Sequence, residues 1–192
     1  TLRRQGSGLR VEVEIRDADG VVATGSVAAD DDLTPSVRLV LPEGRRRAWS
    51  PADPHLYDLT VRLLDPDGAA LDSVDSYAGL RSVAVRGQKV LINGEPIFQR
   101  LVLDQGYWPD TLMTAPTDEA LRADIELGLA AGFNGARMHQ KVFEERYLYH
   151  ADRLGYLVWG EFADWGAGTG VGVEDHQRPT ASFVTQWLEA VE

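Results

Sequence analysis

The sequence predicts a β-sandwich followed by a unit of parallel strands and helices. Residues 1–84 contain short runs in which apolar and polar residues alternate between turn residues, and this pattern is typical of an antiparallel sandwich. From about residue 86 the period changes, and a helix, a glycine and a buried strand follow one another twice. Strands that alternate with helices form parallel βα units, so the second part is either a doubly wound sheet or a barrel.

The first domain, residues 1–84, is expected to be all-β. Leu9 to Arg16 places alternate apolar residues on one face, and the turn that ends at Gly20 leads into a strand at 21–27. Further strands are predicted at 37–41, 57–64 and 69–77. For such a module, a passive structural role is favoured over ligand binding.

The second domain, residues 85–192, begins with a hairpin around Asn93 and Gly94, whose second strand continues over 97–103. A helix capped by Thr117 and closed by Gly132 leads to a strand at 133–139. The next unit has a helix at 143–154, a terminating glycine at 155 and a strand at 156–160, and a third helix begins near residue 180. The chain stops inside this helix without a cap. We therefore expect a truncated domain with at most three parallel strands.

Composition narrows the possible partners. A net charge of -11 over 192 residues disfavours nucleic acid, because phosphate binding needs a basic face. The chain has no cysteine, which excludes disulfides and thiolate metal sites. No apolar run reaches the ~20 residues of a membrane helix, so no membrane partner is expected. Residues 1–8 resemble no signal peptide, and the compartment is left unassigned.

A series of short motifs carries a resemblance to a known family. In chain order, the motifs are Trp49-Ser50-Pro51, Pro54 to Leu59, Gly79 to Val83, Leu91 to Pro96, Asp124-Ile125, Gly132 to Asn134, Arg137, Ala151 to Gly155, and Glu161. Over about residues 49–161 this series resembles the sandwich-to-barrel passage of glycoside hydrolase family two, which includes β-galactosidases, β-glucuronidases and β-mannosidases. The resemblance implies an immunoglobulin-like β-sandwich followed by the first βα units of a (β/α)8 TIM barrel. Residues 137–142 depart from the Arg-x-Ser-His-Tyr-Pro pattern of many members, so the sugar is not specified.

The resemblance also implies a retaining mechanism with two carboxyl groups. In the family the acid/base is a Glu directly after an Asn on the fourth strand, and the nucleophile is a Glu on the seventh. Asn93 and Asn134 are each followed by glycine, so neither catalytic Glu is expected in this chain, and the isolated chain is expected to be inactive. No cofactor is expected. The alternatives are a non-catalytic carbohydrate-binding or assembly module and a metal-dependent barrel hydrolase with ligands further along the chain.

Four polar residues at predicted strand ends are candidates for binding a carbohydrate substrate. Arg137 and His139 are two residues apart, so their side chains should leave one face of the second parallel strand. The resemblance places Glu161 at the sugar site or beside a divalent cation, with a plain ion pair as the structural alternative. Asp104 ends the first parallel strand and could join them. Asp104, His139 and Glu161 would also suit a hard metal ion, but their spacing is generic and no metal is predicted.

Aromatic residues near the strand ends are the remaining candidates. Tyr107, Trp108 and Trp165 could stack on a sugar ring or could pack within loops, and both interpretations stay open. Trp159, inside a predicted strand, is expected to be part of the core. A truncated barrel would expose an unpaired strand and apolar helix faces, so self-association through that edge is also expected.

Overall fold

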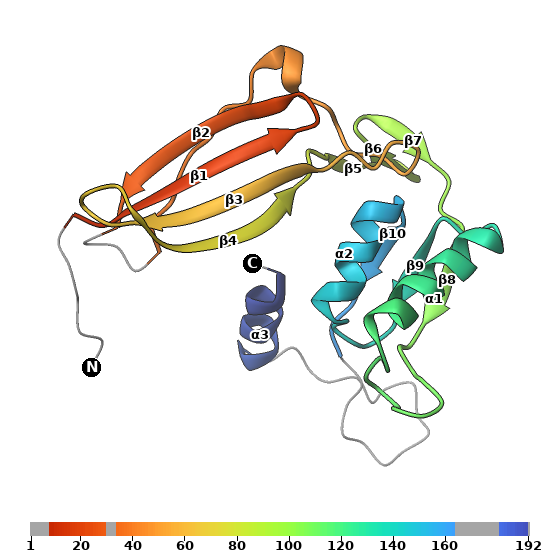
Figure 1. The fold of residues 1–192 in the computed structure, drawn as a ribbon. Coiled ribbons are helices and arrows are strands. Elements are labelled where there is room, and N and C mark those ends of the chain that lie inside the picture. Colours follow the sequence, from red (N-terminus) through yellow and green to blue (C-terminus); the bar gives the residue numbers. More distant parts are fainter. Residues whose placement is uncertain (1–7, 30–33, 164–180, 192) are drawn as a thin grey trace. The chain divides into compact units, whose positions relative to one another are not determined.

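The computed structural model describes residues 8–29, 34–163 and 181–191 (Figure 1). By its internal contacts, the chain divides into two compact units, Thr1–Pro96 and Ile97–Glu192. The domain boundary predicted between residues 84 and 85 falls inside a short strand, β5 (Val83–Arg86), near the end of the first unit. Each unit is described separately below.

The first unit contains an antiparallel sheet of four strands in the order β2-β1-β3-β4 (Figure 1). Its strands are β1 (Arg10–Asp17), β2 (Gly20–Ala28), β3 (Tyr57–Leu64) and β4 (Ala70–Ala78), close to the predicted ranges. A short 3-10 helix, η1 (Glu43–Arg45), precedes β3. The core of this sheet consists of Ile15, Val22 and Tyr57, because alternate residues of each strand face one side.

The prediction of a strand at 37–41 is wrong, because this segment forms no strand in the structure. It nevertheless covers the core, because Leu39 and Leu41 pack against the buried residues of the sheet. A Cβ atom at Gly25 would lie only 2.6 Å from Leu39 Cδ2, so glycine lets the segment approach β2 closely. Proline residues at 35 and 42 flank the segment and lack the N–H group that a strand ladder needs. The second layer of this unit is therefore an extended segment.

A second, smaller sheet has the order β5-β6-β7, with β6 (Lys89–Ile92) and β7 (Glu95–Ile97) forming the hairpin predicted around Asn93 and Gly94. Both turn residues have positive φ, 52° and 84°, as an Asn-Gly turn requires. The Asn93 side chain accepts a hydrogen bond from the Ser82 backbone N–H at 3.0 Å and donates one to the Trp49 carbonyl at 2.9 Å. This amide therefore joins the turn to two other segments of the unit.

The second unit has three parallel strands in the order β10-β9-β8, which confirms the predicted parallel arrangement (Figure 1). Its strands are β8 (Leu101–Asp104), β9 (Gly135–Met138) and β10 (Leu157–Gly160), and its helices are α1 (Asp118–Ala130), α2 (Glu145–Leu154) and α3 (Ala181–Val191). The predicted cap at Thr117 accepts a hydrogen bond from Ala120 N–H at 3.2 Å. Gly155, with φ of 71°, ends α2 as predicted.

The strand predicted continuously over 97–103 is interrupted between β7 and β8. Asn134 explains the interruption, because its side chain takes over the backbone groups on both sides of residue 99. The amide donates to the Phe98 carbonyl at 2.9 Å and accepts from the Arg100 N–H at 2.7 Å. These backbone groups are thus satisfied without a neighbouring strand.

The two faces of the parallel sheet have different environments. Ala136 and Met138 of β9 are buried in a core that Leu121 and Ile125 of α1 and Tyr147 and Ala151 of α2 complete. Arg137 lies on the opposite face, paired in register with Leu103 and Trp159. Trp159 is 50% exposed, so its assignment to the core is wrong. The error follows from register, because Trp159 is paired with Arg137 on the face opposite to the helices, whereas its neighbour Val158 is paired with Ala136 and packs against the helix-side core.

Candidate functional site

Three of the predicted binding residues meet at the carboxyl ends of β9 and β10. The Arg137 guanidinium donates a hydrogen bond from Nε to Glu161 Oε1. His139 Nδ1 lies 3.4 Å from Glu161 Oε2, so the carboxylate stands between the two cationic or potentially cationic side chains. Arg137 and His139 therefore leave the same side of β9, as their spacing predicts.

The charge of Glu161 is controlled by these contacts. Burial raises the pKa of the Glu161 carboxyl. Hydrogen bonds from Arg137 and from the Gln140 N–H, together with the charges of Arg137 and His139, lower this pKa by more than burial raises it. The net pKa therefore lies below its ordinary value. Glu161 is thus ionised at neutral pH. A carboxylate held in this form is suited to orienting a guanidinium and an imidazole and is a poor proton donor.

Glu161 also fixes the turn that follows β9. Its second oxygen accepts a hydrogen bond from the Gln140 N–H at 3.1 Å. Gln140 has a φ of 57°, a left-handed conformation that is unfavourable for a residue with a side chain and that needs support from its surroundings. The sequence offered no signal for this turn, because it depends on a carboxylate 21 positions away.

Asp104 makes different contacts from those predicted. It is paired in register with Met138, which faces the helices, and its side chain hydrogen-bonds with Asp124 of α1. Its Oδ1 also accepts from the Gly106 N–H at 2.7 Å. Only the backbone of Asp104 reaches the β9 turn, through a 2.7 Å hydrogen bond from His139 N–H to its carbonyl.

The two aspartates act as a coupled pair. Burial, followed by the charge of Asp104 and the hydrogen bond to it, raises the pKa of Asp124 to about 6. A hydrogen bond between two carboxyl groups requires a proton on one of them, so the pair favours sharing a proton over carrying two charges. Sequence reasoning did not identify Asp124 as part of any pair, because the contact joins a helix to a strand end 20 residues earlier.

The aromatic candidates separate into two environments. Tyr107 is 64% exposed, while the half-buried Trp108 packs against the helix-side core. Backbone hydrogen bonds of 2.7 and 3.0 Å between Trp108 and Leu112 close a tight turn around this residue. Trp165 lies outside the described residues. Of the described pair, Tyr107 is the side chain available for stacking.

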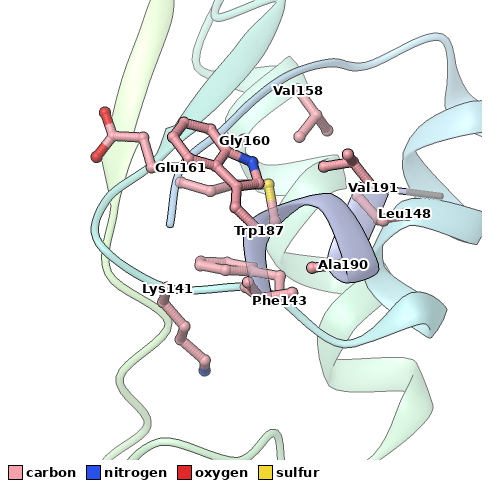
Figure 2. A pocket seen from close by; sticks show the side chains of 11 residues that line it. Lys141, Phe143, Leu148, Val158, Gly160, Glu161, Trp187, Ala190 and Val191 are labelled. Atoms are coloured by element: carbon pink, nitrogen blue, oxygen red, sulfur yellow. The ribbon is translucent and has the colours of Figure 1, made fainter. Parts of the chain in front are cut away.

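An apolar pocket lies beside the strand ends and is lined mainly by side chains of β9, β10, α2 and α3 (Figure 2). Leu148, Val158, Trp187 and Val191 contribute its apolar surface, and the rings of Phe162 and Trp187 stack with centroids 6.2 Å apart. Figure 2 shows the Glu161 carboxylate directed away from these apolar side chains. Glu161 therefore lines the pocket, while its carboxylate takes part in the polar cluster.

Within residues 8–29, 34–163 and 181–191, no group of three or more His, Asp or Glu side chains is arranged to hold a metal ion. No helix in the same part of the chain is long and apolar enough to cross a membrane.

The antiparallel module and the parallel βα units define a multidomain β and α/β protein with a polar cluster at parallel strand ends. The model of the glycosyl hydrolases family 2 matches residues 2–81. Relatives of known name extend the similarity into the second unit. A β-galactosidase of Aeromonas hydrophila is 35% identical over 164 residues, covering 81% of this chain and 16% of that protein. A β-glucuronidase of Paenibacillus borealis is 31% identical over 154 residues, covering 79% of this chain and 24% of that protein.

Solved structures agree with these matches. A glycosyl hydrolase family 2 member from Bacteroides cellulosilyticus superposes with a TM-score of 0.64 and 26% identity, over 83% of this chain and 22% of that one. An FMN-binding β-glucuronidase from Facaelibacterium prausnitzii has a TM-score of 0.72 at 24% identity, over 82% of this chain and 24% of that one, which supports the fold alone. These matches support a glycosyl hydrolase family 2 fragment, and the chain spans less than a quarter of the length of these relatives.

Proposed function

We propose that this chain is part of a family-two glycosidase that hydrolyses a terminal β-linked sugar with retention of configuration. The observation that carries the proposal is the ionised Glu161 between Arg137 and His139, at the carboxyl ends of two parallel strands. Barrel enzymes bind their substrates at this end of the strands. The β-galactosidase and β-glucuronidase relatives support the reaction class.

In this proposal β8, β9 and β10 are the first three strands of a TIM barrel whose remainder lies outside the chain. Their parallel order and the helices α1 and α2 on one face support the assignment. The opposite face, which carries Arg137, Leu103 and Trp159, would then form part of the barrel interior. A complete barrel needs about 250 residues, so the two catalytic carboxylates would lie on later strands.

The site residues would bind and orient the sugar, with no catalytic role. Arg137 and His139 offer N–H donors to sugar hydroxyl groups or to a substrate carboxylate, and Glu161 holds the Arg137 guanidinium by a hydrogen bond and lies 3.4 Å from His139 Nδ1. Tyr107, exposed in the loop after β8, offers an aromatic face to the apolar side of a sugar ring. Asp104 would act through its backbone contact with His139.

The test is to assay the full-length protein against a panel of β-linked nitrophenyl sugars. Arg137→Ala, His139→Ala and Glu161→Gln should each lower kcat/KM by about 10- to 100-fold through lost positioning. Arg122→Ala and Glu126→Gln are matched controls, because these residues form an exposed ion pair on α1 with an Nε to Oε1 distance of 2.7 Å. The isolated chain should give no turnover. Turnover by the isolated chain that disappears in Glu161→Gln would instead make Glu161 catalytic.

The second candidate is a non-catalytic carbohydrate-binding or assembly protein of the same architecture. It is supported by the sequence, because Asn93 and Asn134 are each followed by glycine and neither catalytic Glu is expected in this chain. An Asn-Glu pair and a later strand-end Glu in the continuation of the sequence would favour the enzyme. Sugar binding by a full-length protein that hydrolyses none of the panel would favour the binding module.

A further inference from the structure

The loops that follow β8 and β9 are joined by one side chain. Lys141 Nζ donates hydrogen bonds to the Gly106 carbonyl at 3.2 Å and to the Met113 carbonyl at 2.6 Å. These two carbonyls lie near opposite ends of residues 105–113, which we name the β8 loop. Tyr107 and Trp108 lie between them in the sequence. A single ammonium group therefore closes the β8 loop and ties it to the turn after β9.

The ammonium site is small and closely packed. Nζ lies 5.0 Å from the centroid of the Phe143 ring, within the range of a cation–π contact. A Cβ atom at Gly106 would lie 2.7 Å from Nζ and 3.1 Å from Phe143 Cζ, so a side chain here would displace the ammonium group. Gly106 also has a φ of 64°, which favours glycine independently.

The chemistry of the site suits lysine better than arginine. The chain contains 19 basic residues, and all but Lys89 and Lys141 are arginine. Position 141 therefore carries a different basic residue from the arginine found at almost all other basic positions of the chain. A compact ammonium can aim separate N–H bonds at two carbonyls in a small space, whereas a planar guanidinium is larger and holds its N–H groups in one fixed plane.

We propose that Lys141 is a positioning residue for substrate binding, which holds the β8 loop and its exposed Tyr107 in one conformation for contact with a sugar bound at the Arg137, His139 and Glu161 cluster. The proposal rests on the proposed function, because it assigns a purpose to the loop only if a sugar binds beside it. Without Lys141 the two carbonyls lose their shared donor, and the loop gains conformational freedom that substrate must then remove on binding.

The experiment uses the full-length protein with Lys141→Met, Lys141→Arg, Tyr107→Ala and the double variant Lys141→Met/Tyr107→Ala. Lys141→Met should raise KM about tenfold and change kcat by less than twofold, because it removes binding that ground state and transition state share. Lys141→Arg should fail to restore KM. The double variant should be no worse than the more impaired single variant, because both changes affect one interaction. Lys89→Met, in the other unit, is the control and should match the wild type.

Hydrogen exchange of residues 105–113 gives a readout that does not depend on activity. Exchange in Lys141→Met should rise in this loop and stay unchanged in β9. Unchanged exchange in the loop would overturn the clamp itself, whereas faster exchange with an unchanged KM, or fully additive effects with Tyr107→Ala, would overturn its role in substrate positioning. If neither Arg137→Ala nor Lys141→Met alters kinetics or sugar binding, the proposed function fails as well, and only the exchange result keeps its meaning.

Discussion

Replacing Asp124 by asparagine should stabilise the protein at neutral pH and leave it unchanged in mild acid. The wild-type side chain of Asp124 lies against the carboxyl group of Asp104, and burial and this neighbour raise its pKa to about 6. An amide can donate the hydrogen bond that the pair otherwise needs a proton to make. Asp124→Asn therefore removes the repulsion between two charges and keeps the contact.

The magnitude follows from the difference between the ordinary pKa of 3.8 and about 6 in the folded protein. Undiminished, this difference would correspond to about 3 kcal/mol. Asp124 is an exposed residue of α1 whose carboxyl is only partly shielded, so solvent screening reduces the expected effect to about 1 kcal/mol. The pKa of Asp124 is higher in the folded than in the unfolded wild type. The stabilisation by the protonated aspartate pair is therefore complete below about pH 4 and is lost as pH rises through about 6.

Urea unfolding from pH 4 to pH 8 tests this expectation. The wild type should lose about 1 kcal/mol of unfolding free energy between pH 4.5 and pH 7.5, and Asp124→Asn should lose much less. Asp110→Asn, which changes an exposed aspartate of the same unit, should follow the wild-type curve. Parallel curves for the wild type and Asp124→Asn across this range would refute the shared proton.

Four further predictions concern packing, charge and association. Gly135→Ala should destabilise the second unit by roughly 3 kcal/mol in urea unfolding, because the new Cβ would lie 2.4 Å from the Leu157 carbonyl oxygen, whereas Gly160→Ala meets no atom within 4 Å and should be nearly neutral. Ile125→Ala, at a fully buried position of α1, should cost about 3 kcal/mol in the same measurement. Asp118 has a strongly lowered pKa because of hydrogen bonds from Arg146 and then His150, so its contribution to the free energy of unfolding is present above pH 4 and is lost in acid. In Asp118→Asn the loss of stability below pH 4, measured by circular dichroism, should therefore be smaller than in the wild type. The isolated chain should self-associate in light scattering, because the sheet face with Leu103 and Trp159 is about half exposed, and a monomer at high concentration would contradict this.

Local signals in the sequence were sufficient to predict most elements. Thr117 begins α1, Gly155 ends α2, and Asn93 with Gly94 forms the β6–β7 turn, because each of these residues acts on its own neighbours in the chain. The spacing of Arg137 and His139 likewise predicted that both side chains leave one face of the strand, since alternation along a strand is a local property, whereas their contacts with Glu161 depend on the tertiary fold.

Features that depend on distant partners could not be predicted. The segment 37–41 has a strand-like sequence but no ladder partner, and Trp159 is exposed because of its register with β9. The Asp104–Asp124 pair and the two hydrogen bonds of Lys141 each join segments that only the tertiary fold brings together. The residues at the strand ends could therefore be identified from the sequence, whereas the contacts that orient their side chains could not.

The two asparagines of the chain have a consequence for the chemical lifetime of the protein. Asn93 and Asn134 each precede a glycine, the sequence context in which deamidation is fastest, and each uses its amide to join two backbone groups. Conversion to aspartate would replace the donating Nδ2 by an oxygen facing the carbonyl of Trp49 or Phe98. Two acceptors would then face each other at both positions. Slow ageing in storage would thus loosen the β6–β7 turn and the start of β8, while the polar cluster around Glu161 kept its covalent structure.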